Sequence, residues 1–490
     1  MNIFKFAFLI FVLPMITGSC NKSPDKENNK PNIVFILSDD MGWADLPVYG
    51  NRFNEAPRLT KMAEEGIRFT NAYAACPVCS PTRASIQSGQ YPARVGVIDF
   101  ITGHWRPYEK VIVPTNRTQY LPNNIITLGE TMKKAGYKTG YFGKWHLGHS
   151  DEHHPSKRGY DIAYEYKGGG YFNPRFKPDY KISDPKRSLS AILTDMSVNF
   201  FEENRDTSFF MFLAHFDVHV QLDSDSALIK KYLKKDKVGG YPCNAVYAAM
   251  VESVDKSVGR VLDKLDELGL GENTIVMFFS DNGGLVCRFD EIPLIAQSKQ
   301  YIYEGDSLLY IASSNAPLRA EKGTVYEGGI REPFIARWPA KIEPGQISDA
   351  LISSVDFYPT LVSVTGGELP EGQVLDGKNI LPELTGNNPE PERTLFWHYP
   401  VYHHDVPKSV IRKGDWKLIE NLVDHTFELY NLKEDISESN NLAESKPEKL
   451  NELKTELKDI QEDTGARFPV ENPDFDESKR YIWDRHPDRN

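Results

Sequence analysis

The fold is decided by residues 31–40, which read PNIVFILSDD. The unbroken apolar run from Ile33 to Leu37, bounded by Pro31 and by two acids, is typical of a strand buried on both faces. Further apolar runs alternate with helical patterns, at residues 137–142, 208–216 and 274–279. This alternation predicts an α/β fold with a large mixed, mostly parallel sheet sandwiched by helices.

Two of the segments between these runs carry clear helix signals. Thr127 and Glu130 form a capping-box pattern, and the helix that they open should stop at Gly136. Apolar residues spaced three and four apart from Val251 to Leu268 predict an amphipathic helix that ends at Gly269.

The composition is that of a globular protein. Of 490 residues, 40% are hydrophobic, 26% charged and 12% aromatic, which excludes a disordered, collagenous or coiled-coil chain. The net charge of −12 argues against nucleic acid as a partner, because phosphate backbones need clustered Lys and Arg. Five cysteines are too few for a disulfide scaffold.

The pattern of apolar residues in the sequence changes near residue 393. Short runs at 410–412 and 416–419 are typical of antiparallel hairpin strands, and leucines at 450, 453 and 457 mark one amphipathic helix. We therefore expect a smaller C-terminal α+β subdomain with a short antiparallel sheet and one helix. The predicted divisions are a main domain at 31–392, this subdomain at 393–465 and an irregular tail at 466–490.

The N-terminus has the features of an export signal. Lys5 precedes a short apolar run, Phe6–Met15, which is too short to span a bilayer. Cys20 ends the signal at 1–20 after small residues, as in the lipid-attachment box of bacterial lipoproteins, and 21–30 is a polar tether. We expect a periplasmic or outer-membrane lipoprotein of a bacterium, lipidated on Cys20. The alternative is an ordinary cleaved signal with an incidental cysteine.

Polar side chains follow two of the apolar runs in the same way. The first run leads into Asp39 and Asp40, and the last leads into Asp281 and Asn282. In open α/β sheets, ligands bind outside the carboxyl ends of the strands. Carboxylates brought together there repel each other without a cation, and hard oxygen ligands suit Ca²⁺ or Mg²⁺. The alternative is that these residues only begin turns.

Residues 76–89 contain two cysteines in a polar setting, CPVCSPTRASIQSG. Cys79 has Arg83 nearby, and a neighbouring cation lowers the pKa of a thiol, so Cys79 could be an activated nucleophile. It could equally form a disulfide with Cys76. The residues alone leave both interpretations open.

The pattern Cys79-x-Pro81-x-Arg83, followed by Ser88 and Gly89, resembles the signature of the formylglycine-dependent (type I) sulfatases of the alkaline-phosphatase superfamily. The resemblance covers about residues 31–460. Other segments match the family in order, at 143–148 (GKWHLG), His219, 317–331, 428–432 and 441–442. The sequence departs from the family at Thr82, Gln87 and Val218, and by an insertion from Cys287 to Ile311, which either shapes the substrate entrance or is a mobile loop.

The resemblance implies a chemical mechanism. Cys79 would be oxidised to formylglycine by a separate maturation enzyme, and the hydrated aldehyde would attack the sulfur of a sulfate ester. The metal, Ca²⁺ in the family with Mg²⁺ accepted by the same ligand types, would be held by Asp39, Asp40, Asp281, Asn282 and the modified Cys79.

The resemblance also implies roles for the cationic and histidine side chains. Lys144 and Lys322 would neutralise sulfate oxygens, and Arg83 would hold the formylglycine and the metal-site carboxylates. His146 would hydrogen-bond the formylglycine hydroxyl, and His219 would be the general acid at the leaving oxygen. By contrast, His215 is expected to be a core histidine and Cys76 a structural or incidental one.

We expect the substrate to be a sulfated glycan or oligosaccharide, attacked at a terminal galactose or N-acetylgalactosamine sulfate. Candidate sugar-binding residues are Asp99, His104, Trp105, Arg106, His398 and His403. One alternative is a formylglycine-dependent phosphodiesterase or phosphonate monoester hydrolase. Others are a catalytically silent glycan-binding lipoprotein and a metal-free thiol enzyme.

Overall fold

A computed structural model describes residues 30–484, except 104, 185, 289–291 and 387–391. The signal sequence, Cys20 and nearly all of the tether lie outside the described residues, as do His104 and the last six residues of the tail. Within the described part of the chain, no helix combines the length and the apolar character needed to span a membrane.

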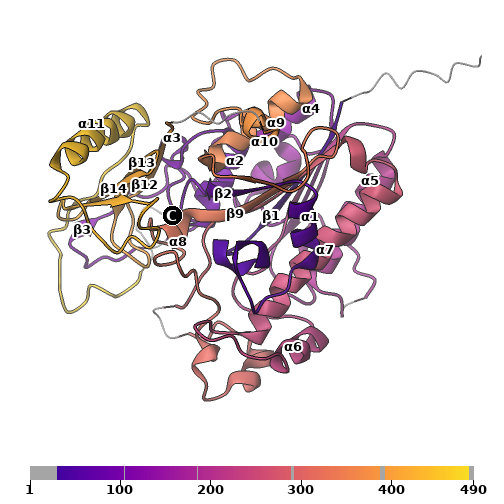
Figure 1. The fold of residues 1–490 in the computed structure, drawn as a ribbon, viewed down its shortest axis with the longest axis horizontal. Helices are drawn as coiled ribbons and strands as arrows, with labels where there is room; N and C mark the ends of the chain where they lie inside the picture. The colour runs from indigo at the N-terminus through magenta and orange to yellow at the C-terminus, as the bar shows by residue number, and fades with distance from the viewer. Residues whose placement is uncertain (1–29, 104, 185, 289–291, 387–391, 485–490) are drawn as a thin grey trace, which may run out of the picture.

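The main domain is built on a ten-stranded mixed sheet with the order β10-β2-β9-β8-β1-β7-β4-β5-β6, and β11 pairs with β2 (Figure 1). The central strands β8, β1, β7, β4 and β5 run parallel, whereas β9 is antiparallel to both β8 and β2. Their bounds are β1 Asn32–Ser38, β2 Ile67–Tyr73, β4 Lys138–Gly143, β5 Ile162–Tyr166, β6 Phe176–Lys177, β7 Phe209–Ala214, β8 Thr274–Ser280, β9 Arg331–Arg337, β10 Gln346–Ser348 and β11 Ile352–Ser353.

Helices cover both faces of this sheet, as predicted. The bounds are α1 Pro57–Glu64, α2 Cys79–Ser88, α3 Pro92–Val95, α4 Leu128–Lys134, α5 Leu189–Asn204, α6 Ser226–Leu233, α7 Ala245–Glu267, α8 Glu327–Ile330, α9 Phe357–Thr365 and α10 Leu381–Leu384. The two predicted helices are confirmed: Thr127 caps α4 through a capping box with Glu130, and α7 ends at Glu267, with Leu268 as its C-cap just before Gly269.

Strand β1 shows why its sequence is apolar without alternation. Val34 and Ile36 belong to a core with α1, α5 and α7. Phe35 and Leu37 belong to a second core with α2, α4 and α9 on the opposite face. Because both faces of the strand are covered, every position from Asn32 to Ser38 is buried.

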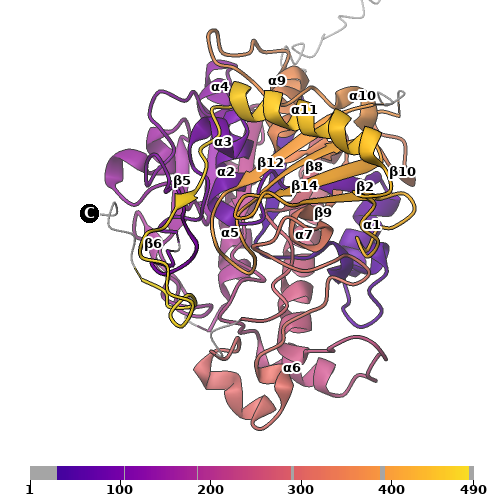
Figure 2. The same ribbon diagram turned by 90° about the vertical axis from the view of Figure 1, so that its left-hand side faces the viewer.

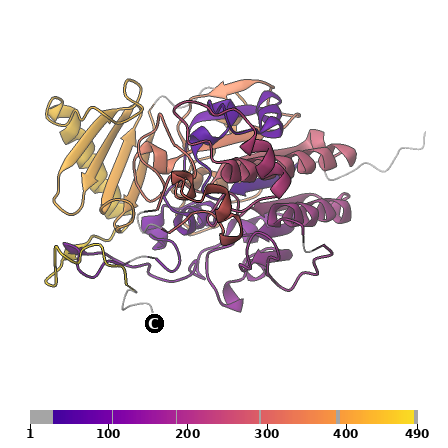
Figure 3. The ribbon, with the colours of Figure 1, turned by 90° about the horizontal axis from the view of Figure 1, so that it is seen from below.

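The C-terminal subdomain is a four-stranded antiparallel sheet with one helix, as expected (Figure 2). Its elements are β12 Thr394–Tyr399, β13 Lys408–Lys413, β14 Trp416–Asn421, β15 Phe427–Asn431 and α11 Pro447–Asp463. Leu453 and Leu457 of α11 pack on the sheet. The subdomain lies beside the main domain (Figure 3), and Trp397 Nε1 donates a hydrogen bond of 2.7 Å to Ala74 O across the junction.

The tail is more ordered than predicted. Its β16, Val470–Glu471, pairs with β3, Val111–Ile112, and Asp484 forms a β-bridge with Trp105. Backbone pairing therefore holds this part of the chain against the main domain. The side-chain pattern of a short segment does not reveal such pairing.

Candidate active site

Two neighbouring strands deliver the acidic residues to one edge of the sheet. Strands β1 and β8 are parallel, with Ser38 opposite Ser280, so the residues after them leave the sheet at the same level. Asn282 Nδ2 lies 2.8 Å from Asp40 Oδ1, and the Asp40 N–H donates to Asp281 Oδ1 at 3.2 Å. Asp39, Asp40, Asp281 and Asn282 are all buried. The structure thus brings the four predicted oxygen ligands together.

The donor atoms present fit a divalent cation. Oxygen ligand atoms from Asp39 and Asp281 and Sγ of Cys79 lie within 4.8 Å of one another, as do atoms of Asp39, Asp40 and His219. Among the described residues, Asp39 Oδ1 and Asn282 Oδ1 are buried without a hydrogen-bond partner. Buried polar atoms are almost always partnered, so these two oxygens are suited to a hard cation such as Ca²⁺ or Mg²⁺.

Three cationic side chains surround the carboxylates. Lys144 Nζ lies 2.5 Å from Asp39 Oδ2, and Lys322 Nζ lies 2.7 Å from Asp40. Arg83 contacts Asp281 Oδ2 through Nε at 2.8 Å and Nη2 at 2.7 Å. Each of the three predicted cationic residues therefore lies beside a predicted metal ligand.

The backbone before Lys144 depends on a glycine. Gly143 ends β4 with φ of +117°, and a Cβ there would lie 1.8 Å from Ala214 O on the neighbouring strand β7. Only glycine allows this close approach. Gly143 therefore lets the backbone pass close to β7, and the side chain of Lys144 reaches Asp39 at the end of β1.

The electrostatics of the carboxylates differ. Burial alone would raise the pKa of Asp39, but Lys144, His219 and Arg83 outweigh it and hold that pKa well below its usual range. Burial, with Asp39 as a neighbouring charge, raises the pKa of Asp281 well above its usual value, even though Arg83 opposes this. Burial and the charge of Asp39 thus disfavour the ionised form of Asp281, and a bound cation would favour it.

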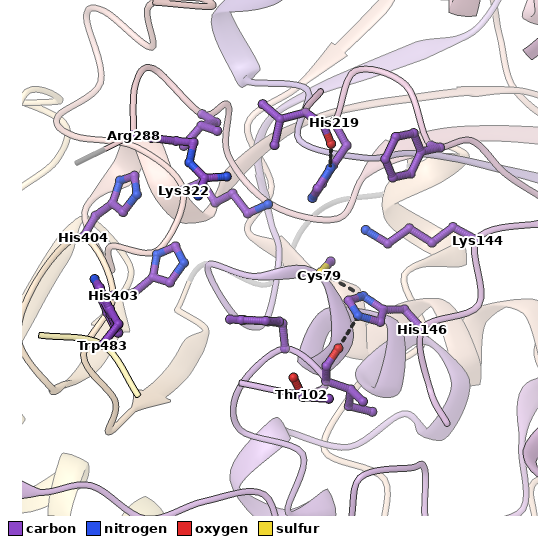
Figure 4. A pocket seen from close by; sticks show the side chains of 15 residues that line it. Cys79, Thr102, Lys144, His146, His219, Arg288, Lys322, His403, His404 and Trp483 are labelled. Carbon is purple, nitrogen blue, oxygen red and sulfur yellow. Dashed lines mark hydrogen bonds between the residues drawn. The ribbon is translucent and has the colours of Figure 1, made fainter. Parts of the chain in front are cut away.

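Cys79 begins α2 and faces His146. Its Sγ lies 3.2 Å from His146 Nδ1, and His146 Nε2 lies 2.5 Å from the carbonyl oxygen of Ile101 (Figure 4). Burial, together with Lys144 and Arg83, lowers the pKa of His146 to about 3, so the ring is neutral at neutral pH. Since the Ile101 carbonyl can only accept, Nε2 carries the proton and Nδ1 is left to accept a hydrogen bond from residue 79.

The other cysteine of the motif has a different environment. Cys76 and Cys79 are both free thiols, so the disulfide alternative is not what the structure shows. Cys76 packs in the core below the C-terminal sheet, and burial raises the pKa of its thiol. Its carbonyl accepts a 2.9 Å hydrogen bond from Thr82 Oγ1. Gln87, the other departure in this helix, bonds the hydroxyl of Tyr160 at 2.9 Å.

His219 follows β7 and faces the same carboxylates. Its Nε2 lies 3.7 Å from Asp40 Oδ2, and its Nδ1 lies 2.5 Å from the Val220 carbonyl oxygen. Burial lowers the pKa of His219 to about 4, because the opposing effect of Asp40 is smaller. His215 is instead a core residue, as expected, with Nε2 at 3.0 Å from Ser257 Oγ.

These residues lie in a cavity of about 660 Å³ (Figure 4). Its inner part is lined by Cys79, Lys144, His146, His219 and Lys322. Toward the other side it is lined by Arg288, His403, His404 and Trp483. The cavity walls thus come from the main domain, the start of the predicted insertion, the C-terminal subdomain and the tail.

The candidate sugar-binding residues are scattered. His403 lines the cavity, and Arg106 lines a neighbouring one. Asp99 and His398 line neither: Asp99 Oδ1 accepts from the Phe100 N–H, and His398 bonds Ser409 and the Arg467 carbonyl. Both side chains are buried and bonded to protein groups, and a role for them in sugar binding stays a prediction. Trp105 pairs with the tail through its backbone.

Several cavity residues were missed by sequence reasoning. They include Phe100, Ile101, Thr102, Phe216, Val220, Leu285, Arg288 and Trp483. Apolar side chains such as Phe216 look like ordinary core, and Trp483 stands in a segment without periodicity. Arg288, the second residue of the predicted insertion, lines the cavity, so the start of the insertion contributes to the cavity wall.

Comparisons with known proteins agree with this geometry. Residues 31–367 match the Sulfatase family, and residues 320–463 match the family described as N-sulphoglucosamine sulphohydrolase, C-terminal. A sulfatase of Formosa agariphila is 31% identical, over 90% of this chain and 89% of that protein. Human N-acetylgalactosamine-6-sulfatase is 33% identical, over 72% of this chain and 66% of that protein.

Solved structures are similar as well. The structure of Ps i-CgsB in complex with k-i-k-neocarrahexaose matches with a TM-score of 0.73 at 26% identity. The match covers 91% of this chain and 94% of that chain. The similarity therefore extends over the main domain and the C-terminal subdomain.

Proposed function

This chain belongs to the sulfatase family and is a sulfuric ester hydrolase, and we propose that it removes sulfate from a terminal sugar of a sulfated glycan or oligosaccharide. The observation that carries the proposal is that Cys79, Lys144 and Lys322 line one cavity, directly beside the buried carboxylates of Asp39, Asp40 and Asp281. The relatives named for galactosamine and carrageenan substrates support a galactose-type or N-acetylgalactosamine sulfate.

We propose that Cys79 is converted to formylglycine by a separate maturation enzyme. Hydrated formylglycine supplies two hydroxyls on one carbon, the first to attack sulfur and the second to release sulfate as the aldehyde returns. The neutral Nδ1 of His146, 3.2 Å from residue 79, is positioned to accept a hydrogen bond from such a hydroxyl.

Asp39, Asp40, Asp281 and Asn282 would hold a divalent cation, Ca²⁺ by family expectation, together with the group at residue 79. The cation supplies positive charge for the sulfate oxygens and the attacking hydroxyl. Arg83, through its contacts with Asp281 and the Lys144 carbonyl oxygen at 2.7 Å, fixes the carboxylate and the lysine backbone together.

The two lysines and His219 would act on the substrate. Lys144 and Lys322 lie on the cavity wall and can transfer from carboxylate partners to sulfate oxygens, because both are flexible point charges. His219 is neutral in the free site and must carry a proton on Nε2 to act as a general acid. The incoming sulfate anion favours that protonated form, and the proton would pass to the sugar oxygen as the sulfur–oxygen bond breaks.

The sequence supports a proposal about location. Cys20 and its preceding small residues would direct lipidation and place the enzyme in the periplasm or outer membrane, where sulfated polysaccharide is met. Replacement of Cys20 by Ala should move the protein from the membrane to the soluble fraction of cells that express the full chain. Retention of Cys20→Ala in the membrane fraction would contradict the lipid anchor.

The test of the proposed activity is sulfate release by matured, full-length protein. The substrates are 4-nitrocatechol sulfate, sulfated mono- and oligosaccharides, and matched phosphate mono- and diesters. We expect release from at least one saccharide and little hydrolysis of the phosphate esters. Activity on the aryl sulfate alone would contradict the glycan substrate, and a preference for phosphodiesters would favour the phosphodiesterase alternative.

A further inference from the structure

A second cavity adjoins the one that holds Cys79. Its volume is about 540 Å³, and it shares His403, His404 and Trp483 with the first. Its other walls include Arg106, Glu109 and Tyr481, none of which lines the first cavity. The two cavities therefore meet at Trp483 and the two histidines, and a ligand longer than one sugar can extend from one into the other.

The tail segment that carries Trp483 is held firmly at this place. Strand β16 pairs with β3, and Asn472 Nδ2 donates to the Glu109 carbonyl at 2.7 Å. The Asp484 N–H donates to the Trp105 carbonyl at 3.1 Å, one residue beyond Trp483. These backbone contacts fix the tail on both sides of the tryptophan.

The side chains around Trp483 also hold it in place. The Arg106 guanidinium lies 4.0 Å from the indole centroid, a cation–π contact. Glu109 holds Arg106 at 3.3 Å through one oxygen and Arg480 at 3.3 Å through the other. A fixed aromatic ring with polar neighbours presents an apolar face beside hydrogen-bonding groups. A sugar ring is complementary to this surface, because it has an apolar C–H face and hydroxyl groups around its edge.

The charges of the two cavities differ. The inner part of the first cavity presents Lys144 and Lys322, which suits an anion. In the second cavity Arg106 and Arg480 are matched by Glu109 and Asp405, so its acidic and arginine side chains balance. A balanced polar wall suits the hydroxyls of a neutral sugar better than a second sulfate.

We propose that the second cavity binds the neutral sugar unit next to the sulfated one, with Trp483 as its stacking surface. This inference rests on the proposed glycan sulfatase function. It makes the C-terminal tail a determinant of specificity and predicts that the enzyme prefers an oligosaccharide to the monosaccharide that carries the same sulfate.

The test compares kcat/KM on matched pairs of substrates with matured, full-length protein. Both members of a pair carry the same sulfated sugar, either galactose or N-acetylgalactosamine with sulfate on carbon 4 or carbon 6. One member is the monosaccharide. The other is an otherwise neutral galactan tetrasaccharide with that sugar at its non-reducing end. We expect the tetrasaccharide to be favoured about tenfold, as for a binding surface centred on one tryptophan. Trp483→Ala should remove most of this preference through KM, and Trp483→Phe should keep it.

Two further variants keep the test decisive. Tyr481 is 70% exposed and lines only the second cavity, so Tyr481→Ala should fold and should weaken the tetrasaccharide alone. Phe475, an exposed aromatic of the same tail that lines neither cavity, is the matched control, and Phe475→Ala should change nothing.

The outcomes separate the two proposals. Equal kcat/KM of the unaltered enzyme on the monosaccharide and the tetrasaccharide would overturn the second sugar site. Equal losses on these two substrates in Trp483→Ala and Tyr481→Ala would overturn it as well. Either result would leave the glycan sulfatase proposal intact. Hydrolysis of 4-nitrocatechol sulfate without hydrolysis of any saccharide would overturn the glycan substrate, and the second sugar site with it.

Discussion

Lys144 and Asp39 form a buried ion pair, with Nζ 2.5 Å from Oδ2, although they are 105 residues apart in the sequence. In the free site this lysine therefore occupies one oxygen of a carboxylate that we assign to the metal. The other oxygen, Oδ1, has no hydrogen-bond partner among the described residues. A cation at Oδ1 and the Lys144 ammonium at Oδ2 would therefore compete for the single negative charge of Asp39 and repel each other.

This competition gives a prediction for Lys144→Ala. The substitution should lower kcat/KM about 10²–10³-fold, because one charge on the sulfate oxygens is lost. It should not weaken Ca²⁺ binding, because the variant removes a competing cation. Calorimetric titration of Ca²⁺ into metal-free protein measures the second effect, with Asp39→Asn as the control that loses both activity and binding. Weaker Ca²⁺ binding by Lys144→Ala would contradict the arrangement.

Removal of the metal should be reversible. Chelation should abolish sulfate release and lower the melting temperature, since a ligand at 100 times its Kd stabilises the folded state by about 2.7 kcal/mol. Activity measurements and scanning calorimetry before chelation, after it and after return of Ca²⁺ or Mg²⁺ check this. Full activity in the chelated protein would argue for the metal-free thiol enzyme.

The state of residue 79 can be read by mass spectrometry. The tryptic peptide from Phe69 to Arg83 contains both Cys76 and Cys79. In protein made with the maturation enzyme, we expect one thiol to be replaced by an aldehyde, at residue 79 only, while Cys76 provides the internal control. Cys79→Ala should lower activity by about 10³-fold or more. Two intact thiols in active protein would refute the formylglycine mechanism.

The role of His219 predicts a dependence on the leaving group. A sugar alkoxide needs a proton as it leaves, whereas 4-nitrocatechol is already a good leaving group. His219→Ala should therefore lower kcat on a sulfated sugar by about 10²–10⁴-fold and on the aryl sulfate much less. The exposed His425 is the matched control, and its replacement by Ala should change neither rate. Equal losses on both substrates would assign His219 to binding instead.

The sequence predicted those features that depend on local residue patterns or on recognisable motifs. The unbroken apolar run of β1 required cover on both faces, and the paired acidic turns required neighbouring parallel strands, so the sheet and the oxygen ligands followed. The sugar-binding residues could not be predicted in the same way. Asp99 is polar because it supports backbone groups, whereas Trp483 reaches the cavity because the tail pairs with the main domain through β16 and β3 and through Asp484 and Trp105. Such contacts depend on long-range packing that one sequence does not display.

The junction between the two domains contains a buried charge cluster that predicts a strong effect on stability. Lys417 of β14 is fully buried, and its Nζ lies 2.9 Å from Glu327 and 2.8 Å from Glu438. Lys417→Met should destabilise the fold by about 3–5 kcal/mol, because two buried carboxylates lose a shared partner. Lys413, on the neighbouring strand, pairs with Glu452 and Glu456 at the surface, so Lys413→Met should cost about 0–1 kcal/mol.

The destabilisation by Lys417→Met should depend on pH. Burial raises the pKa of Glu438 from 4.5 to about 7 even with Lys417 present. The folded state therefore holds this proton more tightly than the unfolded state, and stability is lost as pH rises from about 4.5 through about 7. Removal of Lys417 raises the pKa of Glu438 further, so the deficit measured by scanning calorimetry should be smaller at about pH 5 than at about pH 8. A deficit that stays constant or grows as the pH falls would contradict this account, because the pKa of Glu438 would then not rise when Lys417 is removed.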